Sequence, residues 1–375
     1  MKRLYWTNPD VYEVEVEVKS VGDCTVTIDP IVFHPDEGGQ PADKGRIGQC
    51  DVLNVEIIEG RIVHTLDKPL SDGTYIACVD SRHRLHIARR HTAQHIISGI
   101  AEKRFGLKTV GVHIGLESCT VDFDKKIDWE TAQAIERDSM EAVTENIPVE
   151  TVFNDTDARS RFDLKEIASD IIRVVKIDDY DASACCGTHV RRTGDIGIIR
   201  ILDLESKKNG TRVSFAAGPT ALEFSQAETS ILKELRQLSK CSTIELPAIL
   251  RKAMESSKNL NKEVERLQGL MLPGFVESAT IVEVGSSKIG IQIDAVSTKL
   301  AGKLAAMIAN EIDGTGIVIS EGNVVINSSN LDANDILKKL HKAVGGKGGG
   351  SSNAASGRLD KQVTTEQVVE ILKEL

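Results

Sequence analysis

The 375-residue sequence lacks any apolar run of 18 residues, so no segment of it is suited to form a transmembrane helix. Its first residues, MKRLYWTNPDVYEVEVEV, also lack the apolar core of a secretory signal peptide. The seven cysteines, an odd number scattered along a long chain, do not make a secreted disulfide framework. We therefore expect a soluble, cytoplasmic protein with reduced thiols, in which any special cysteine is a metal ligand or a structural thiol.

An excess of basic residues is also missing, since the formal net charge is -10. This balance argues against nonspecific binding of nucleic acid by the whole surface. It does not exclude a local basic surface that binds nucleic acid. Two basic clusters are present: RHRLHIARRH at Arg82 to His91, and the pair Arg191 and Arg192. Charge runs are commonly solvated surface. These two lie beside candidate metal ligands, which also favours a binding role.

The first half of the chain divides into two regions. Residues 1–80 alternate apolar and polar positions in short runs separated by glycine, which predicts a small antiparallel β-barrel. Residues 81–218 combine helical patterns at 89–105 and 129–146 with short β-branched runs, which predicts an α+β domain.

The second half also divides into two regions. Residues 219–274 are rich in strong helix formers and predict a helical arm, with Pro247 in the first turn of its second helix and Pro273-Gly274 at its end. Residues 275–375 alternate strands and helices and predict a compact α/β domain, with a glycine-rich loop before its final helix. The fold class predicted for the whole chain is α+β.

The residues that can carry chemistry are concentrated in the second region. His91 and His95 are one helical turn apart, opposite the apolar stripe of their helix, where both imidazoles can share one metal ion. The glutamate of a metalloprotease helix is absent, because Thr92 follows His91. Cys185 and His189, in ACCGTHV, are four residues apart in a glycine-containing turn. Three nitrogens and one sulfur make a donor set suited to Zn2+, one ion per chain.

With these motifs the sequence resembles a known family. HTAQH, CGTHV some ninety residues later and HPDEGGQPADKG upstream are similar to the editing domain of alanyl-tRNA synthetase and to its free-standing relatives, the AlaX trans-editing proteins. The arm at 219–274 and the tail GGKGGGSSNAASG are similar to the coiled arm and the C-terminal domain of the synthetase. The tail makes the long AlaX form the best match. Nothing before Met1 can house an amino-acid-activating core, so we expect a chain that lacks aminoacylation.

The resemblance implies a zinc-containing editing domain that hydrolyses the ester of Ser-tRNA(Ala), with Gly-tRNA(Ala) left open as a second substrate. Such a site is needed because a pocket that admits alanine cannot strongly reject glycine or the near-isostere serine. It also implies that the zinc ligands are His91, His95, Cys185 and His189.

The motifs depart from the family pattern at two positions. Cys186 stands where the family usually has glycine, and Glu37 stands where a third consecutive glycine is usual. The spacing to His189 favours Cys185 as the ligand, and Cys186 stays open as an alternative. The role of zinc stays open too: three protein ligands leave a position for water or substrate, whereas a fourth closes the site.

Further residues receive roles from the resemblance or from their place beside the ligands. Candidate catalytic residues are Thr92, His113 and Thr188, although the two threonines also suit local caps and His113 also suits a strand niche. Candidate substrate-binding residues are Gly38, Gly39, Gln40, Arg191 and Lys347. Lys347 and its neighbouring glycines can bind an RNA phosphate or form a flexible surface loop.

Two other functions stay open. One is a metal-dependent hydrolase that acts on a small ester, and the other is a non-catalytic RNA-binding protein with a structural zinc site. The expected partner is tRNA(Ala) mischarged with serine, without a membrane. A homodimer through the arm and the C-terminal domain also fits the sequence.

Overall fold

The computed structural model describes residues 3–116, 118–153 and 173–373. It confirms an α+β fold and contains two compact units, Met1–Glu234 and Leu235–Leu375. The four-region division predicted from the sequence stays a prediction. None of the helices in the described part of the chain is both long enough and apolar enough to cross a bilayer.

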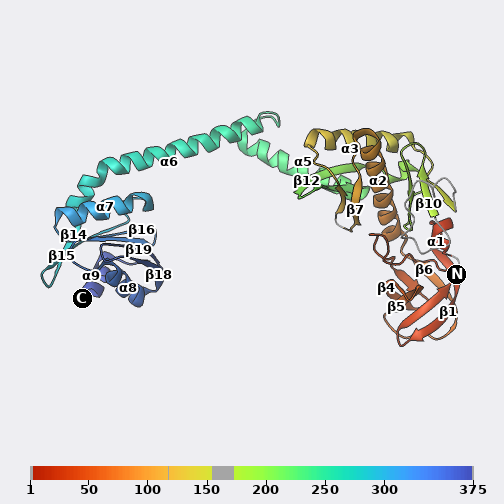
Figure 1. Cartoon of the computed structure of the whole chain (residues 1–375), viewed down its shortest axis with the longest axis horizontal. Coiled ribbons are helices and arrows are strands. Elements are labelled where there is room, and N and C mark those ends of the chain that lie inside the picture. The colour runs from red at the N-terminus through yellow and green to blue at the C-terminus, as the bar shows by residue number, and fades with distance from the viewer. Residues whose placement is uncertain (1–2, 117, 154–172, 374–375) are drawn as a thin grey trace. The chain divides into compact units, whose positions relative to one another are not determined.

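The first unit begins with a short helix α1 (Leu4–Thr7) and a closed barrel, drawn in red and brown in Figure 1. The barrel order is β1-β2-β5-β4-β3-β6, which confirms the predicted antiparallel barrel. Alternating apolar residues such as Val16, Val26 and Val55 are buried inside it. The strands are β1 (Glu13–Gly22), β2 (Thr25–Asp29), β3 (Gly45–Ile47), β4 (Cys50–Ile58), β5 (Arg61–Leu66) and β6 (Gly73–Val79).

A long central helix, α2 (Ser81–Phe105), follows the barrel and packs against the rest of the unit. It begins at Ser81 rather than at the predicted Arg89, because the Asp80 carboxylate accepts the N–H groups of Arg82 and His83 and caps the helix there. It ends at Gly106, which adopts the left-handed conformation. The buried ion pair between Arg84 and Asp43 ties this helix to the barrel loop between β2 and β3.

Two antiparallel sheets and a second helix complete the first unit. One sheet has the order β12-β13-β8-β7 and packs with α2 and α3 in one apolar core, whereas the other has the order β11-β10-β9. The elements are β7 (Thr109–Ile114), β8 (Cys119–Phe123), α3 (Trp129–Glu145), β9 (Glu150–Phe153), β10 (Arg173–Ile177), β11 (Asp181–Ala184), the 3-10 turn η2 (Thr193–Ile196), β12 (Ile199–Lys207) and β13 (Gly210–Ala217).

The predicted arm consists of α5 (Pro219–Ser239), which spans the division between the units, and α6 (Leu246–Glu277). Pro247 lies in the first turn of α6, as predicted. The prediction that the arm ends at Pro273-Gly274 is wrong, because α6 continues through Pro273. Its last turns are held by tertiary packing: Leu272 is buried against α7, and Gln292 donates to the carbonyl of Phe275. This packing offsets the hydrogen bond that a proline removes from a helix interior.

The second unit is a mixed six-stranded sheet covered on both faces (Figure 1). Helix α7 and the end of α6 cover one face, and α8 and α9 cover the other. The strand order is β14-β15-β16-β17-β19-β18, and only β15 and β16 pair in parallel within it. The elements are β14 (Thr280–Val284), β15 (Ser287–Ile293), α7 (Thr298–Glu311), β16 (Thr315–Ser320), β17 (Asn323–Ser328), α8 (Ala333–Val344), β18 (Gly346–Gly350), β19 (Ala354–Leu359) and α9 (Thr365–Leu372).

The prediction of a glycine-rich loop before the final helix is also wrong. Gly346–Gly350 forms strand β18 at the edge of the sheet, paired antiparallel with β19. Glycine has a low intrinsic preference for strands. A ladder of backbone hydrogen bonds to β19 needs no side chains, and it decides the conformation here.

Candidate metal centre

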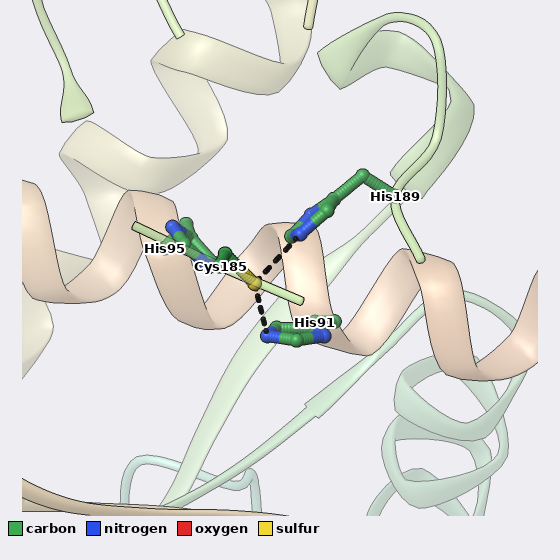
Figure 2. Close-up of side chains that lie close together, drawn as sticks. All are labelled: His91, His95, Cys185 and His189. Carbon is green, nitrogen blue, oxygen red and sulfur yellow. Dashed lines mark hydrogen bonds between the residues drawn. The ribbon is translucent and has the colours of Figure 1, made fainter. Parts of the chain in front are cut away.

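Four donor side chains meet between α2 and the turn that follows β11 (Figure 2). His91 and His95 come from one face of α2, and Cys185 and His189 come from the turn. The sulfur of Cys185 lies 3.4 Å from Nε2 of His91 and 3.3 Å from Nε2 of His189, and the four donor atoms all lie within 4.8 Å of one another. The sequence prediction of this set is thus supported by its convergence in space.

The Nδ1 atom of His91 is held by a residue from the barrel loop. It lies 2.7 Å from Oε1 of Gln40, and the backbone N–H of Thr188 donates to the same oxygen at 3.0 Å. Because an amide oxygen can only accept, Nδ1 of His91 carries the proton and its Nε2 lone pair faces the cluster. Gln40 is itself buried, and its Nε2 donates to the hydroxyl of Thr188.

The other two histidines are oriented in the same way. Nδ1 of His95 donates to the carboxylate of Asp181 at 2.7 Å, so Nε2 is the ring nitrogen that remains to bind a metal ion. Nδ1 of His189 lies 3.2 Å from the hydroxyl of Thr92, whose own proton is donated to the carbonyl of Ala88. That hydroxyl therefore accepts from Nδ1 of His189. All three imidazoles thus present Nε2 to one place.

This donor set fits zinc. A tetrahedral ion with Zn–S and Zn–N bonds of ordinary length would place sulfur and nitrogen roughly 3.5 Å apart. The distances of 3.3 and 3.4 Å at Cys185 are close to that value. Each Nδ1 has an acceptor behind it, Gln40, Asp181 or Thr92, and the carboxylate of Asp181 is a partner that metal-bound histidines usually have.

The local electrostatics also suit a cation. Burial by itself raises the pKa of the Cys185 thiol, but the neighbouring His91, His189 and His95 outweigh burial and hold that pKa well below its ordinary value. Burial lowers the pKa of His95, but the charges of Cys185 and Asp181 raise it to about 10. Burial holds the pKa of His189 well below its ordinary value. The three imidazoles therefore favour the thiolate form of Cys185, which is the form that binds metal.

The neighbouring residues show why Cys185, and not Cys186, enters the cluster. Burial raises the pKa of the Cys186 thiol to about 11, and its backbone carbonyl accepts a hydrogen bond from Trp6. Gly187 is required next, because a side chain there would place its first carbon 2.2 Å from Cε1 of His91. The turn can pass this close to His91 only with glycine at position 187.

Some predicted substrate-binding residues lie together beside β7. The carbonyl of Gly39 accepts the N–H of Ile114, which places the Gly38-Gly39 loop next to the exposed His113. Gly39 has a positive φ of 77°, and a side chain there would meet the carbonyl of Val112 at 2.9 Å. The loop therefore depends on glycine at this position, and its approach to His113 agrees with a shared role.

Other predicted residues are placed differently. Arg191 is exposed and forms an ion pair with Asp10. With His189 it lines two small cavities, of about 130 Å³ and about 250 Å³. The hydroxyls of Thr92 and Thr188 are buried and bonded within the protein, which favours a positioning role for both. Lys347 lies on the edge strand of the second unit.

Local sequence patterns did not identify Gln40 and Asp181 as supports of the ligands. Gln40 was predicted to bind substrate, and Asp181 received no role. Asp181 lies four residues before Cys185, but no local pattern marks it as a partner of His95. These pairings join residues 51 and 86 positions apart, so only the fold brings them together.

Comparisons with known proteins match two parts of the chain to families. Residues 172–213 match the threonyl and alanyl tRNA synthetase second additional domain, and residues 279–375 match the DHHA1 domain. The first match contains Cys185 and His189, and the second contains the sheet with the glycine-rich edge strand. Both halves of the predicted resemblance are therefore found independently.

Curated relatives match nearly the whole chain. The alanine–tRNA ligase of Methanothermobacter thermautotrophicus is 31% identical over 99% of this chain and 44% of its own length. That of Methanopyrus kandleri is 28% identical over 94% of this chain and 42% of its own length. The chain thus spans less than half the length of these relatives.

Among solved structures, RecJ from Thermus thermophilus in complex with Mg2+ matches 36% of this chain and 20% of that chain, at 15% identity and a TM-score of 0.25. The domain matches and the ligases confirm the resemblance to alanyl-tRNA synthetase that the motifs predict. The chain is similar to alanine–tRNA ligases over nearly its whole length, and parts of it match the second additional domain and the DHHA1 domain.

Proposed function

We propose that the chain is an editing hydrolase that removes serine from mischarged Ser-tRNA(Ala). The observation that carries this proposal is the convergence of His91, His95, Cys185 and His189 on one place, within a chain related to alanyl-tRNA synthetase. The relationship by itself supports a tRNA-related role. The metal centre adds a place where ester chemistry can occur.

The residues of the chain have separate tasks in this proposal. His91, His95, Cys185 and His189 would hold Zn2+, which when bound would polarise a carbonyl or position the aminoacyl end. Arg191, exposed beside two cavities that adjoin His189, is placed to contact the RNA end. Holding a labile ester in one geometry next to water supplies much of the rate increase that such a reaction needs.

The exposed His113 and the Gly38-Gly39 loop form a second surface of the proposed site. The loop is tied to the metal ligands through Gln40, the residue that follows it. A serine hydroxyl, which alanine lacks, gives such a site a group to recognise by hydrogen bonding. We propose that Ser-tRNA(Ala) is selected in this way, and that Gly-tRNA(Ala) is a weaker substrate.

The test is release of serine from Ser-tRNA(Ala) by the purified full chain, with its zinc content counted. Ala-tRNA(Ala) and Ser-tRNA(Ser) are the controls for the amino acid and for the tRNA. Release from the first substrate alone is expected, and His95→Ala should abolish it while the circular dichroism spectrum stays unchanged. If wild-type protein with one zinc ion releases no serine from Ser-tRNA(Ala), the proposal is wrong.

A second candidate function is RNA binding with a structural zinc site. It is favoured by the presence of four protein donors, because four donors can close a zinc site. It predicts that tRNA is retained in a filter or gel assay without turnover. A hydrolase acting on a small ester is the third candidate, and it would show turnover of a seryl ester without dependence on tRNA.

The predicted homodimer is also part of the proposal. Helix α6 exposes a series of apolar side chains, among them Leu250, Leu260 and Leu270, each more than 60% exposed. Such a stripe is rarely left in water on a monomer. Sedimentation of the full chain should give the mass of a dimer, and Leu260→Glu should shift it toward the monomer.

A further inference from the structure

The turn that carries the metal ligand Cys185 is held by two side chains distant in sequence. Nη1 of Arg173 donates to the carbonyls of Cys185, at 3.0 Å, and Gly187, at 2.7 Å. Nε1 of Trp6 donates to the carbonyl of Cys186 between them, at 2.9 Å. We propose that Trp6 and Arg173 are positioning residues of the metal centre, which fix the turn and with it the place of the Cys185 sulfur.

The orientation of the peptide groups explains why the turn needs these donors. The N–H of Gly187 donates to the Cys185 sulfur at 3.4 Å, and the N–H of Thr188 donates to Gln40. The amides thus face the metal centre, whereas three successive carbonyls face Arg173 and Trp6. A buried carbonyl without a donor destabilises the conformation that contains it. Removing either donor should therefore let the turn relax and move the sulfur.

Arg173 is suited to this task by its chemistry. Its side chain is buried, at 5% exposure, and its guanidinium is used on backbone carbonyls and on the hydroxyl of Thr151. A planar guanidinium has donors in a fixed fork, whereas a lysine ammonium is a single compact charge. Lysine at position 173 would keep the charge and lose the fixed geometry.

Trp6 is itself held firmly by the N-terminal segment Arg3–Thr7. The N–H of Leu4 donates to the carbonyl of Ile31 at 2.8 Å, which attaches the segment to the barrel. The guanidinium carbon of Arg3 lies 4.5 Å from the centre of the Trp6 ring, a cation–π contact. Nη1 of Arg3 also donates to Glu37 at 2.9 Å.

The same segment therefore reaches both halves of the site. Through Trp6 it contacts the turn that carries Cys185, and through Arg3 and Glu37 it contacts the loop that carries Gln40, the partner of His91. Glu37 and Cys186 are the two positions at which the motifs depart from the usual glycines. Glu37 contacts the N-terminal segment through its side chain, which gives this departure a structural use. Cys186 makes its contact through the backbone carbonyl, which glycine would also supply.

Binding of Co2+ to metal-free full-length protein tests the proposal without any RNA substrate. Cobalt bound to a thiolate has a charge-transfer absorption band that reports the sulfur–metal geometry. Trp6→Phe keeps a ring and removes the N–H, and it should weaken Co2+ binding by about 10-fold and shift the band, as loss of partners that support ligands does. Arg173→Lys should weaken binding more, by up to about 100-fold.

The matched control is Trp129→Phe, the same substitution at a tryptophan that is 46% exposed at the start of α3. It should bind Co2+ as the wild type does. If Trp6→Phe gives the wild-type affinity and band, Trp6 only fills space and the proposal fails for it. If Arg173→Lys does so, the proposal fails for Arg173.

A milder variant and a second measurement separate effects on folding from effects on the geometry of the metal centre. Arg3→Met removes the support of the Trp6 ring from a side chain that is 24% exposed, and it should shift the band in the same direction by less. A purely structural role predicts a lower unfolding temperature of the metal-free protein with an unchanged band, and that result would overturn the proposal. Because no tRNA is involved, a failed deacylation assay would leave this outcome unaffected.

Discussion

The metal turn of the first unit and the glycine-rich strand of the second unit are both short motifs, but they present different chemistry. At the metal turn the active groups are side chains, and His91, His95 and His189 are each at most 5% exposed, with a partner behind each ring. In β18 the side chains are nearly absent, and Lys347–Gly350 exposes backbone at a sheet edge. Single substitutions should therefore cause a large loss of zinc affinity at the metal turn, and only a small loss of tRNA binding at β18.

The largest effect is expected for the ligand itself. Cys185→Ser should reduce zinc affinity by more than the ~100-fold that loss of a supporting partner costs, because it removes the thiolate. Cys186→Ser, one residue away, is the matched control and should keep one zinc ion per chain, since only Cys185 contributes to the donor cluster. Zinc content after dialysis measures both. Retention by Cys185→Ser with loss by Cys186→Ser would reverse the ligand assignment.

Gly187→Ala should have a similar effect for a steric reason. The added carbon would lie 2.2 Å from Cε1 of His91 and 2.5 Å from Oε1 of Gln40, so the turn must move away from α2. Overpacking of this kind costs about 1–3 kcal/mol of folding free energy. Chemical unfolding and zinc content should both show a loss. Gly197→Ala, where the structure places no atom within 4 Å of the added carbon, is the control for packing, although its positive φ adds some strain of its own.

Asp181→Asn should have an intermediate effect. The carboxylate of Asp181 orients His95 through Nδ1, and a neutral amide is a weaker acceptor. We expect about a 10-fold loss of zinc affinity, measured by competition with a chelator. Asp179→Asn, an exposed carboxylate on the same turn, should leave the affinity unchanged. An equal loss in both variants would indicate a general charge effect in place of orientation.

The smallest effect is expected at the edge strand. Lys347→Ala should weaken tRNA binding by a few-fold, because one phosphate contact is lost. The slope of log affinity against log salt concentration should become shallower by about 1. Zinc content should not change. Lys361→Ala, an exposed lysine outside β18, is the control. If the two variants bind tRNA equally at every salt concentration, the strand has no role in RNA contact.

The alternation of strands and helices in the second unit was predicted from its apolar periods. Strands β18 and β19 were not predicted, because the glycine-rich segment in which they begin gives no periodic signal. The continuation of α6 past Pro273 was missed for a related reason: the packing of Leu272 is a tertiary contact that no local pattern contains.

The candidate site divides in a similar way. Residue type and spacing were enough to select His91, His95, Cys185 and His189, and the preference for Cys185 over Cys186 came from the distance to His189 in sequence. The supporting role of their partners was not predicted: Thr92 was predicted as a catalytic residue and Gln40 as a substrate-binding residue. Their hydrogen bonds to His189 and His91 join residues 97 and 51 positions apart in the sequence.

The sequence by itself determined the donor set, the α+β class and the family, because these depend on residue chemistry, periodicity and short-range spacing. Only the tertiary structure decided which atom of each imidazole faces the cluster. It also decided that Trp6 and Arg173 hold the turn of Cys185. The physical reason is that a hydrogen bond is set by distance and direction in space, and residues far apart along the chain acquire these only when the chain folds.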